Sequence, residues 1–469
     1  MLDIALIREK PEWVKEQIAK LNDPAAVGRV DVIVELDKQR RVLLTESEAI
    51  QAGRNKLNKN IGRLRGDKSL DEATRAARAL ETVKRIEAGD YEGAASVVAG
   101  EVAVMPDATI SADVALGALM QTLGALGGRV ETINEQIREV ETQLEDNMLW
   151  LPNMPHASVP VFDSEEHNIP WTPEGAFYEF DFQPKPHWDL GPELGIIDFE
   201  RGVKLTGSRG YVLTGMGAQL LRALINLYLD MAKAKGFTEL YVPYLVREEM
   251  MIGSAQFPKF RDVVYADSDA ALYLLPTAEV AITNLHRDEI LDEAQLPLYY
   301  VAHTPCFRRE KTSAGRDVRG IKRVHQFEKV EMYKFTTPET SYAELESLTE
   351  AACDICRALK LPFRRLEIVT GDLGFAASKK YDIEIYSPGC DEWLEVSSCS
   401  NTEDFQARRA NVKYRPAEQK RTQYVHTLNG SGLATTRVII AILENYQQVD
   451  GSVVVPEVLR PYMGGAEVI

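Results

Sequence analysis

The sequence predicts an α+β protein whose N-terminal part forms an antiparallel coiled-coil arm. Apolar residues recur every seven positions in two separate stretches of the first third of the chain, which is the pattern of narrow helical seams. Beyond about residue 200, short runs with strand character are interspersed with helical stretches, and two of the strands flank a long polar loop. Mixed strands of this kind with helices indicate an α+β domain built on an antiparallel sheet.

The composition indicates a large cytoplasmic protein without membrane contact. The 469 residues, 45% of them hydrophobic, can bury a sizeable core in two or three domains. No apolar run reaches the roughly 18 residues of a membrane span, and residues 1–15 lack the apolar region of a secretory signal. Five cysteines, an odd number, favour reduced thiols. A formal net charge of −17 argues against indiscriminate nucleic-acid binding and leaves any RNA contact to local basic patches.

No zinc site is expected. Cys353 and Cys356 have redox or zinc spacing, but no second Cys or His pair lies near them and they fall within a predicted helix. His167, His187 and Trp188 show no spacing that supports metal binding or stacking. We therefore expect these residues to have structural roles.

The N-terminal third is predicted to be helical. Residues 1 to about 30 are expected to form a short helical cap, with Pro11 at a helix start and Pro24 in a turn. The two heptad stretches follow, and Pro152 and Pro155 close the second. The first stretch has Leu36, Leu43, Ile50, Leu57 and Leu64 in one column, and the second has Val130, Ile133, Ile137, Val140 and Leu144 in two.

The far end of the first arm helix is basic, and the turn beyond it is enlarged. Residues 51–68 carry six basic residues against one acidic residue, which fits either a solvated helix face or contacts with RNA phosphates. A helical stretch at 69–88 and an Ala- and Gly-rich stretch at 91–128, broken near 105–111, exceed what a plain hairpin needs. We interpret residues 69–128 as an enlarged arm tip and assign no chemistry to it.

The remaining chain is predicted to contain a linker and then the α+β domain. The linker, at about 161–200, is rich in Pro, Trp and His. The expected elements after it are a helix at 217–235 leading into a strand segment at 237–246, strands at 299–301 and 329–335, a helix at 338–359, strands near 363–369, 382–386 and 393–397, and a helix at 434–447.

The loop between the strands at 299–301 and 329–335 concentrates positive charge. Between Arg308 and Arg323, seven basic residues stand against two acidic ones in a chain that is acidic as a whole. This concentration favours a polyanionic ligand, most simply a nucleoside triphosphate, with a solvated hairpin tip as the alternative.

Residues 307–310 (FRRE) resemble the second signature motif of class II aminoacyl-tRNA synthetases. The continuation at 313–317 (SAGRD) and 325–331 (HQFEKVE) is similar to seryl-tRNA synthetases in particular. The later segments that share this resemblance are 395–409 (EVSSCSNTEDFQARR), 426–433 (HTLNGSGL), 444–447 (ENYQ) and 456–463 (PEVLRPYM). The resemblance covers nearly the whole chain. It implies a tRNA-binding domain with the arm at 1–155 and a class II catalytic domain at 156–469.

The resemblance implies ligation of L-serine to serine tRNA through a seryl-adenylate formed from ATP. Arg308 is the implied catalytic residue, because a guanidinium can bridge the serine carboxylate and the α-phosphate. Phe327 is expected to stack on the adenine, with Arg437 on its opposite side, and Glu310 to accept from its amino group. The full set expected to contact ATP is Arg308, Arg309, Glu310, Val324, Phe327, Glu395, Val396, Ser397, Ser398 and Arg437.

The same resemblance assigns a metal ion and a serine pocket. Glu395 and Ser398 supply oxygen ligands suited to Mg²⁺ shared with the ATP phosphates, and a structural carboxylate is the alternative. Glu279 and Glu331 would hold the serine ammonium. The full set expected to contact serine is Thr277, Ala278, Glu279, Arg308, Glu331, Asn429 and Ser431. Arg309 and Thr312 stand where smaller residues are common in the family, a mild departure.

The remaining implications concern partners. The arm would contact the long variable arm of serine tRNA, and the segment at 237–246 would build a homodimer interface. The residues expected to contact the tRNA are Arg54, Lys56, Lys59, Arg63 and Arg65. A relative that charges a carrier protein would lose the arm, which the heptads and the basic far end oppose. A relative without catalysis is opposed by the intact charged residues of the motifs.

Overall fold

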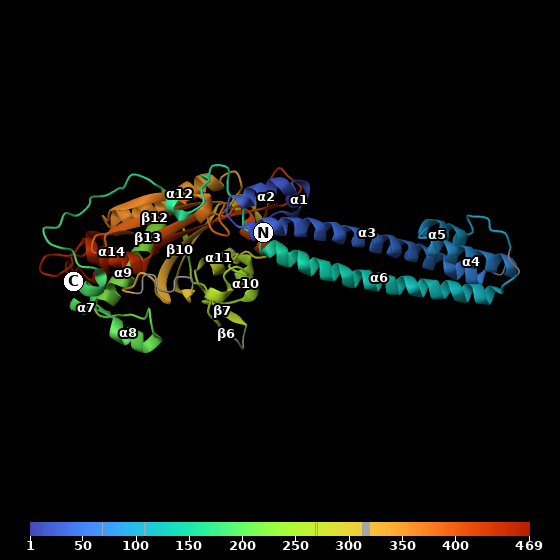
Figure 1. The fold of residues 1–469 in the computed structure, drawn as a ribbon, viewed down its shortest axis with the longest axis horizontal. Coiled ribbons are helices and arrows are strands. Elements are labelled where there is room, and N and C mark those ends of the chain that lie inside the picture. The colour runs from blue at the N-terminus through green and yellow to red at the C-terminus, as the bar shows by residue number, and fades with distance from the viewer. Residues whose placement is uncertain (68, 107–108, 268, 270, 312–318) are drawn as a thin grey trace. The chain divides into compact units, whose positions relative to one another are not determined.

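The computed structural model describes residues 1–67, 69–106, 109–267, 269, 271–311 and 319–469 (Figure 1). Contacts divide the chain into two compact units, one formed by Met1–Gly28 with Leu149–Ile469 and the other by Arg29–Met148. This division groups the first 28 residues with the sheet-containing unit, and the domain limits of 1–155 and 156–469 stay a prediction. Among the described residues, no helix combines the length and the apolar composition that a membrane crossing requires.

The unit of Arg29–Met148 is built on two long helices, α3 (Pro24–Gly66) and α6 (Ala112–Leu149), which run side by side in Figure 1. Arg40 pairs with Glu141 at 2.8 Å, and the Ser47 hydroxyl donates to Asn134 Oδ1 at 3.1 Å, so rising numbers on one helix meet falling numbers on the other. The heptad residues fill the seam, and Ile50 and Leu57 on α3 are fully buried. The predicted antiparallel coiled coil is confirmed.

The tip adds two short helices, α4 (Glu72–Glu87) and α5 (Tyr91–Ala99), which bury mainly alanine and valine against the two long helices. Small residues let these helices approach closely. At Gly53 of α3, a Cβ would lie 2.5 Å from Cβ of Tyr91, so only glycine fits there. Since α6 begins at Ala112, the last part of the Ala- and Gly-rich stretch forms its first turns rather than part of a separate tip.

The N-terminal cap has two helices, α1 (Ile4–Glu9) and α2 (Pro11–Ala19), with Pro11 at a helix start as expected. The expectation for Pro24 was wrong, because Pro24 begins α3 instead of lying in a turn. Proline has no N–H and its fixed φ suits the first turn of a helix, where that N–H would have no partner. The side chain of Asp23 accepts from the Ala26 N–H at 3.0 Å and so caps this turn.

An eight-stranded sheet organises the other unit. Neighbouring strands in this sheet are antiparallel, except that the edge strand β4 is parallel to β9. The strand order is β1 (Ile169–Pro170), β11 (Phe363–Glu367), β12 (Lys379–Ser387), β13 (Glu392–Asn401), β16 (His426–Ala434), β10 (Gln326–Thr336), β9 (Leu298–Phe307) and β4 (Thr238–Leu240). This confirms the antiparallel α+β domain, and it adds β1 from the segment predicted to be a linker.

Side chains of β10 point alternately to the two faces of the sheet, and each face has its own apolar cluster. Val330 and Met332 point into the main core, whereas Tyr333 and Phe335 join a second cluster that includes residues of α11 (Glu279–Thr283) and α13 (Phe405–Ala410). The main core is covered by α9 (Met216–Ala234), α12 (Ser341–Ala358) and α14 (Thr435–Asn445).

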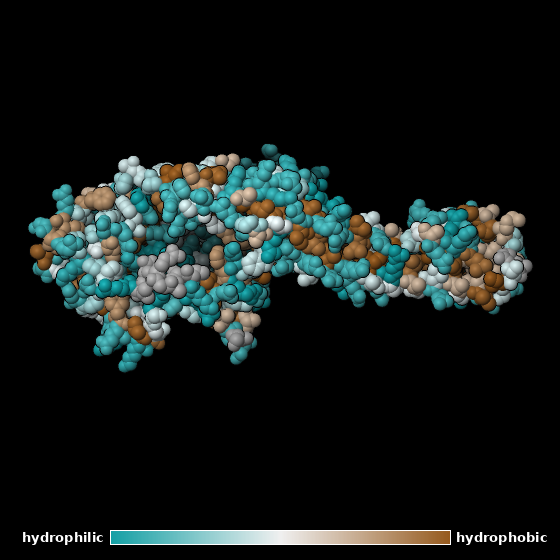
Figure 2. Space-filling model, viewed as in Figure 1, coloured by the Kyte–Doolittle hydropathy of each residue, from teal (hydrophilic) through white to brown (hydrophobic). Residues whose placement is uncertain are grey.

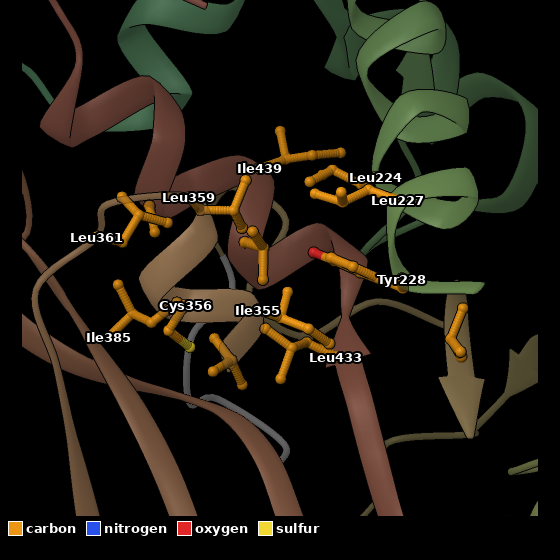
Figure 3. Close-up of a cluster of buried hydrophobic side chains, with 14 of the residues drawn as sticks. Leu224, Leu227, Tyr228, Ile355, Cys356, Leu359, Leu361, Ile385, Leu433 and Ile439 are labelled. Carbon is orange, nitrogen blue, oxygen red and sulfur yellow. The ribbon is translucent and has the colours of Figure 1, made fainter. Parts of the chain in front are cut away.

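Figure 3 shows how side chains from these helices meet. Ile439 of α14 lies beside Leu224 and Leu227 of α9, Ile355 of α12 lies beside Leu433 of β16, and all of them belong to the main core. Cys356, which lies beside them, is fully buried, as is Cys353 one turn earlier. Both thiols therefore belong to the core, in line with their expected structural role.

The remaining elements surround the sheet. They are α7 (His187–Glu193), β2 (Ile197–Asp198), α8 (Phe199–Thr206), β3 (Val212–Leu213), β5 (Leu245–Arg247), α10 (Glu248–Gly253), β6 (Ala266–Asp267), β7 (Leu272–Leu274), β8 (Ile290–Asp292), β14 (Lys413–Arg415) and β15 (Gln423–Tyr424). Short 3₁₀ turns occur at Glu165–His167, Arg261–Val263, Glu293–Gln295, Thr370–Asp372 and Glu457–Met463. The predicted strand segment at 237–246 contains β4 and the start of β5.

Candidate active site

A cavity of about 470 Å³ opens on the sheet face that α9, α12 and α14 leave uncovered. Figure 2 shows a hollow with a hydrophilic lining in this unit. The predicted residues that line the cavity are Thr277, Glu279, Arg308, Glu310, Val324, Phe327, Glu331, Glu395, Val396, Ser397, Ser398, Asn429, Ser431 and Arg437. The residues expected to contact ATP and those expected to contact serine therefore meet in one place, although they lie up to 160 positions apart in the sequence.

Ala278 and Arg309 are not among the described residues that line the cavity. The Ala278 side chain is buried in the second cluster, so only its backbone is available to a ligand. The Arg309 backbone N–H donates to Val263 O at 3.0 Å, and its guanidinium carbon lies 5.5 Å from the centre of the Tyr265 ring. Direct contacts of these two residues with serine and ATP stay predictions.

Arg308 stands immediately after β9, where the hairpin with β10 opens. Its backbone N–H donates to His325 O at 2.9 Å, and its Nε donates to Pro276 O at 3.3 Å. The guanidinium carbon lies 5.2 Å from the centre of the Phe327 ring. These contacts hold the planar Arg308 cation beside the Phe327 ring. The arrangement suits a nucleotide, which combines an aromatic base with phosphates.

A buried polar cluster occupies another part of the cavity. Lys329 forms an ion pair with Glu331, and its Nζ donates to Thr277 Oγ1 at 2.9 Å. The Thr277 hydroxyl in turn donates to Glu331 Oε2 at 3.1 Å. Lys329 was not expected to contribute to the site. The two-residue repeat of a strand could have indicated its position, because Phe327, Lys329 and Glu331 are alternate residues of β10 and so share one face.

Glu279 lies beside this cluster and is held by two amides. Gln406 Nε2 donates to Glu279 Oε1 at 2.6 Å, and Asn429 Nδ2 donates to the same oxygen at 3.3 Å. Burial, with a further contribution from the charge of Glu331, raises the pKa of Glu279 to about 7. Gln406 comes from α13. It was not identified from the sequence, because its position in the sequence gives no indication of a contact with Glu279.

Glu395 and Ser398 reach the same face of β13 because the strand contains a bulge. Ile383 opposes Ser397 and Glu384 opposes Glu395, so Val396 is the extra residue. In a regular strand, residues three apart point to opposite faces, and one extra residue restores them to the same face. The Ser397 hydroxyl instead donates to Ser431 O at 2.6 Å and ties β13 to β16.

The charge around Glu395 is balanced by cations. Burial alone would raise the pKa of Glu395, but Arg437, Lys380, Arg308 and Arg323 together lower it. Arg437, in the first turn of α14, donates from Nη1 to Glu395 O and from Nε to Lys322 O at 3.4 Å. The Glu395 carboxylate, kept ionised, and the Ser398 hydroxyl lie on the same face of β13. This pair of oxygen groups fits the ligands that Mg²⁺ prefers.

The residues predicted to contact tRNA all lie on α3 in the other unit. Lys59, Arg63 and Arg65 are exposed on this helix. Lys56 pairs with Glu92 of α5 at 2.5 Å, and the Arg54 guanidinium lies against Gly127 of α6. The tip helices therefore already engage one end of the basic stretch, while its far end faces solvent.

Comparison with known proteins supports the arrangement. The seryl-tRNA synthetase N-terminal domain model matches residues 1–92, and the tRNA synthetase class II core domain model (G, H, P, S and T) matches residues 261–446. The chain is 53% identical to the serine–tRNA ligase of Roseiflexus sp. (strain RS-1), with 100% of this chain and 99% of that protein covered. It is 48% identical to the serine–tRNA ligase of Chloroflexus aurantiacus (strain ATCC 29366 / DSM 635 / J-10-fl), over 100% of this chain and 99% of that protein.

Solved structures agree with these relatives. The seryl-tRNA synthetase of Pyrococcus horikoshii complexed with ATP has a TM-score of 0.82 and 37% identity over 100% of this chain and 99% of that chain. The cytoplasmic serine–tRNA ligase of Naegleria fowleri in complex with AMP has a TM-score of 0.78 and 29% identity, covering 100% and 98%. Both the sequence and the fold match over their full length. The chain therefore belongs to the seryl-tRNA synthetase family of class II aminoacyl-tRNA synthetases.

Proposed function

We propose that the protein activates L-serine with ATP and transfers the seryl group to serine tRNA. The observation that carries this proposal is the single cavity in which Arg308, Glu395 and Arg437 lie together with Glu279, Glu331 and Asn429. The first three suit a nucleoside triphosphate, and the others suit a small amino acid. Membership of a family that includes serine–tRNA ligases supports both steps, the activation of serine and its transfer to tRNA.

Adenylate formation needs positioning more than acid–base chemistry. A serine carboxylate oxygen attacks the α-phosphorus, the bond to pyrophosphate breaks, and the nucleophile is already ionised. The protein must hold two anions that repel each other in line. Arg308 can bridge both with its planar fork, and its contact with Pro276 O fixes the guanidinium before substrates bind.

The phosphate end of the site would be held by Arg437, with Mg²⁺ bound by Glu395 and Ser398. When bound, the metal supplies positive charge to the ATP phosphates. The bulge at Val396 supports this ligand pair, because it turns both oxygens to the cavity face. Asp382, whose Cα pairs with that of Ser398, adds a further buried carboxyl next to it.

Selection of serine would rest on the cluster around Glu279. The ammonium of serine can pair with the Glu279 carboxylate, while the neighbouring charge of Glu331 is already balanced by Lys329. Asn429 and Ser431 are suited to the serine hydroxyl. A site built to hydrogen-bond a hydroxyl can reject the analogue that lacks it by about 10⁴-fold or more, so alanine should be excluded.

We further propose that the protein works in the cytoplasm as a homodimer. Exposed apolar residues near the edge strand β4 support a dimer interface there: Tyr241 is 88% exposed and Leu245 is 48% exposed. Sedimentation of the protein and of a Tyr241→Ser/Leu245→Ser variant tests this surface. A wild-type monomer, or an unchanged dimer in the variant, contradicts the proposed interface.

The central test is serine-dependent ATP–pyrophosphate exchange, followed by charging of serine tRNA. We expect exchange with serine and not with alanine or threonine, and charging of serine tRNA with the activated amino acid. Exchange without tRNA charging would favour a carrier-charging relative. Absence of serine-dependent exchange contradicts the proposed activity.

A further inference from the structure

A buried polar cluster outside the cavity joins three separate segments of the chain. It consists of His187 at the start of α7, Glu444 near the end of α14, and Cys390 in the turn between β12 and β13. His187 and Glu444 are fully buried. One ligand atom from each residue lies within 4.8 Å of the others, a spacing that a metal site could have.

The hydrogen bonds of the cluster explain it without a metal. The Glu444 carboxylate accepts from His187 Nδ1 at 2.8 Å, from the His187 backbone N–H at 2.9 Å, and from the Ser387 hydroxyl. It also accepts from the Cys390 backbone N–H at 3.1 Å. These bonds lower the pKa of Glu444 against the opposing effect of burial, so the carboxylate stays ionised.

The other nitrogen of His187 is also engaged. The Ile321 backbone N–H lies 3.2 Å from His187 Nε2. A backbone amide can only donate, so Nε2 must be the acceptor and the imidazole proton must be on Nδ1, facing Glu444. A metal ion bound at either nitrogen would break one of these bonds. The imidazole is therefore a neutral bridge between Glu444 and the backbone of Ile321.

The backbone that His187 holds leads directly into the cavity. Ile321 is fully buried, and the next three residues, Lys322, Arg323 and Val324, line the cavity. Gly320 has a φ of +76°, and a Cβ there would lie 1.9 Å from His187 Nε2. Only glycine allows this close approach of backbone and imidazole.

The same backbone is tied to α14 at a second point. Arg437 Nε, seven residues before Glu444 on that helix, donates to Lys322 O at 3.4 Å. Trp188, adjacent to His187, lies under the charged groups of Arg319 and Lys322, at 5.1 and 5.5 Å from its ring. The start of α7 and both ends of α14 thus hold one short segment, residues 319–322.

We propose that His187 is a positioning residue for ATP in the adenylation step, acting by fixing the Ile321 backbone so that residues 322–324 and Arg437 form the nucleotide side of the cavity. This rests on the proposed function of the cavity. His187 is not among the described residues that line the cavity. Its loss should weaken ATP binding and leave the serine cluster, which lies on other elements, unaffected.

Two substitutions at His187 separate its two hydrogen bonds. In His187→Asn, the side-chain amide can still donate to Glu444 in place of Nδ1, but no atom reaches the position of Nε2. In His187→Gln, the carbonyl oxygen can reach that position and accept from Ile321. Both variants bury one amide and lose the ring, so they are matched for polarity and differ by one methylene group.

We expect His187→Asn to raise the KM for ATP about three- to tenfold over His187→Gln in serine-dependent pyrophosphate exchange, which corresponds to one hydrogen bond. The KM for serine should agree between the two within about twofold. Gly320→Ala, which displaces the imidazole from the other side, should also raise the KM for ATP selectively. It provides a second reading if His187→Asn does not fold, as judged by its melting temperature.

Equal KM values for ATP in the two folded His187 variants, or a rise in the KM for serine as large as that for ATP, would overturn the positioning role. So would an unchanged KM for ATP in Gly320→Ala. Absence of serine-dependent exchange in the wild-type protein is a different result, because it contradicts the proposed function itself. The two failures are therefore distinguishable in the same assay.

Discussion

At the residue scale, the cavity is lined by both cations and carboxylates, and some of them form ion pairs. Arg308 and Arg437 are proposed to contact phosphates, Glu395 and Ser398 to bind the metal ion, and Glu279 and Glu331 to hold the amino acid, and all of them line the cavity. Lys329 forms its ion pair with Glu331, whereas Glu279 accepts its hydrogen bonds from the neutral amides of Gln406 and Asn429. This division gives each charged residue a distinct expected phenotype.

Arg308→Ala should abolish adenylate formation while leaving the fold intact. Removing a preorganised donor from a developing transition state costs about 10²-fold or more in rate. Arg308→Lys keeps the charge but loses the planar fork, so we expect it to recover little activity. Pyrophosphate exchange and the melting temperature are the measurements. Near-normal exchange in the alanine variant would remove Arg308 from the mechanism.

Serine binding should weaken as the pH falls below about 7. The pKa of Glu279 is raised to about 7 by burial and by Glu331, so at lower pH its carboxyl is protonated and must lose a proton before it can pair with an ammonium. We expect the Kd for serine, measured by calorimetry, to rise about tenfold for each pH unit below the pKa and to level off above it.

Glu279→Gln is the matched control for this pH dependence. It should raise the KM for serine with little change in the KM for ATP, and its serine affinity should be flat between about pH 6 and pH 8 because the amide does not titrate. A variant that keeps the wild-type pH profile would assign the titration to another group. A defect in ATP alone would mean that residues 277–279 are not the amino-acid loop.

Lys329→Met should destabilise the protein through the ion pair that it breaks. Lys329 and Glu331 are both buried, at 7% and 1% exposure, so the substitution leaves a carboxylate without its cation. Breaking one partner of such a pair costs ~3–5 kcal/mol. Urea unfolding measures the loss. The double variant Lys329→Met/Glu331→Leu should recover much of it, and additive losses would contradict the coupling.

At the scale of elements, β13 and α3 show how local geometry places chemistry. The bulge at Val396 adds one residue to β13, so that the oxygen-bearing side chains of Glu395 and Ser398, three residues apart, share a face. On α3, heptad residues pack in the seam while Lys59, Arg63 and Arg65 are exposed. The seam and the basic surface are therefore independent features of one helix, and the surface can be altered without disturbing the coiled coil.

Charge reversal at Lys59 and Arg63 should weaken tRNA binding and flatten its salt dependence. Each cation removed from an RNA phosphate should reduce the slope of log K against log salt by about 0.9 or less. Lys56→Glu is the comparison, since Lys56 is already paired with Glu92 and should contribute less. Filter binding over a salt series gives the slopes. Unchanged slopes in the Lys59/Arg63 variant would place the RNA-binding surface elsewhere.

At the scale of the whole molecule, the two compact units carry different parts of the proposed activity. The cavity lies entirely within the unit of Met1–Gly28 and Leu149–Ile469, and the predicted tRNA-contacting residues lie entirely within Arg29–Met148. Each unit has its own buried cluster of apolar residues. Activation and tRNA recognition should therefore be separable by deletion.

Deleting residues 32–146, bridged by a short linker, should leave serine-dependent pyrophosphate exchange largely intact and remove tRNA charging. The reason is that the deleted segment packs its own seam and that none of its described residues lines the cavity. Parental charging by the deletion variant would show that the arm is not the recognition element. Loss of exchange in a folded deletion variant would mean that the two units are not independent.

Features that depend on local periodicity and on contiguous motifs were predictable from the amino-acid sequence. The heptad columns predicted the coiled coil because a seven-residue repeat places the apolar residues in a narrow seam along a helix, which is buried against another helix. Alternation along β10 places Phe327, Lys329 and Glu331 on one face, but the strand predicted from the sequence began only at Lys329. The motifs around Arg308 and Glu395 predicted nine of the 24 described residues that line the cavity, and other matching segments added Thr277, Glu279, Asn429, Ser431 and Arg437.

The tertiary structure alone decided the contacts between distant segments. Gln406 reaches Glu279 across 127 positions, and His187 reaches Glu444 across 257. The faces to which the side chains of β13 point depend on a bulge, which is defined by the pairing of β13 with β12. No local pattern encodes these contacts, because each is set by the packing of whole elements against the sheet, which brings together side chains whose separation in sequence is arbitrary.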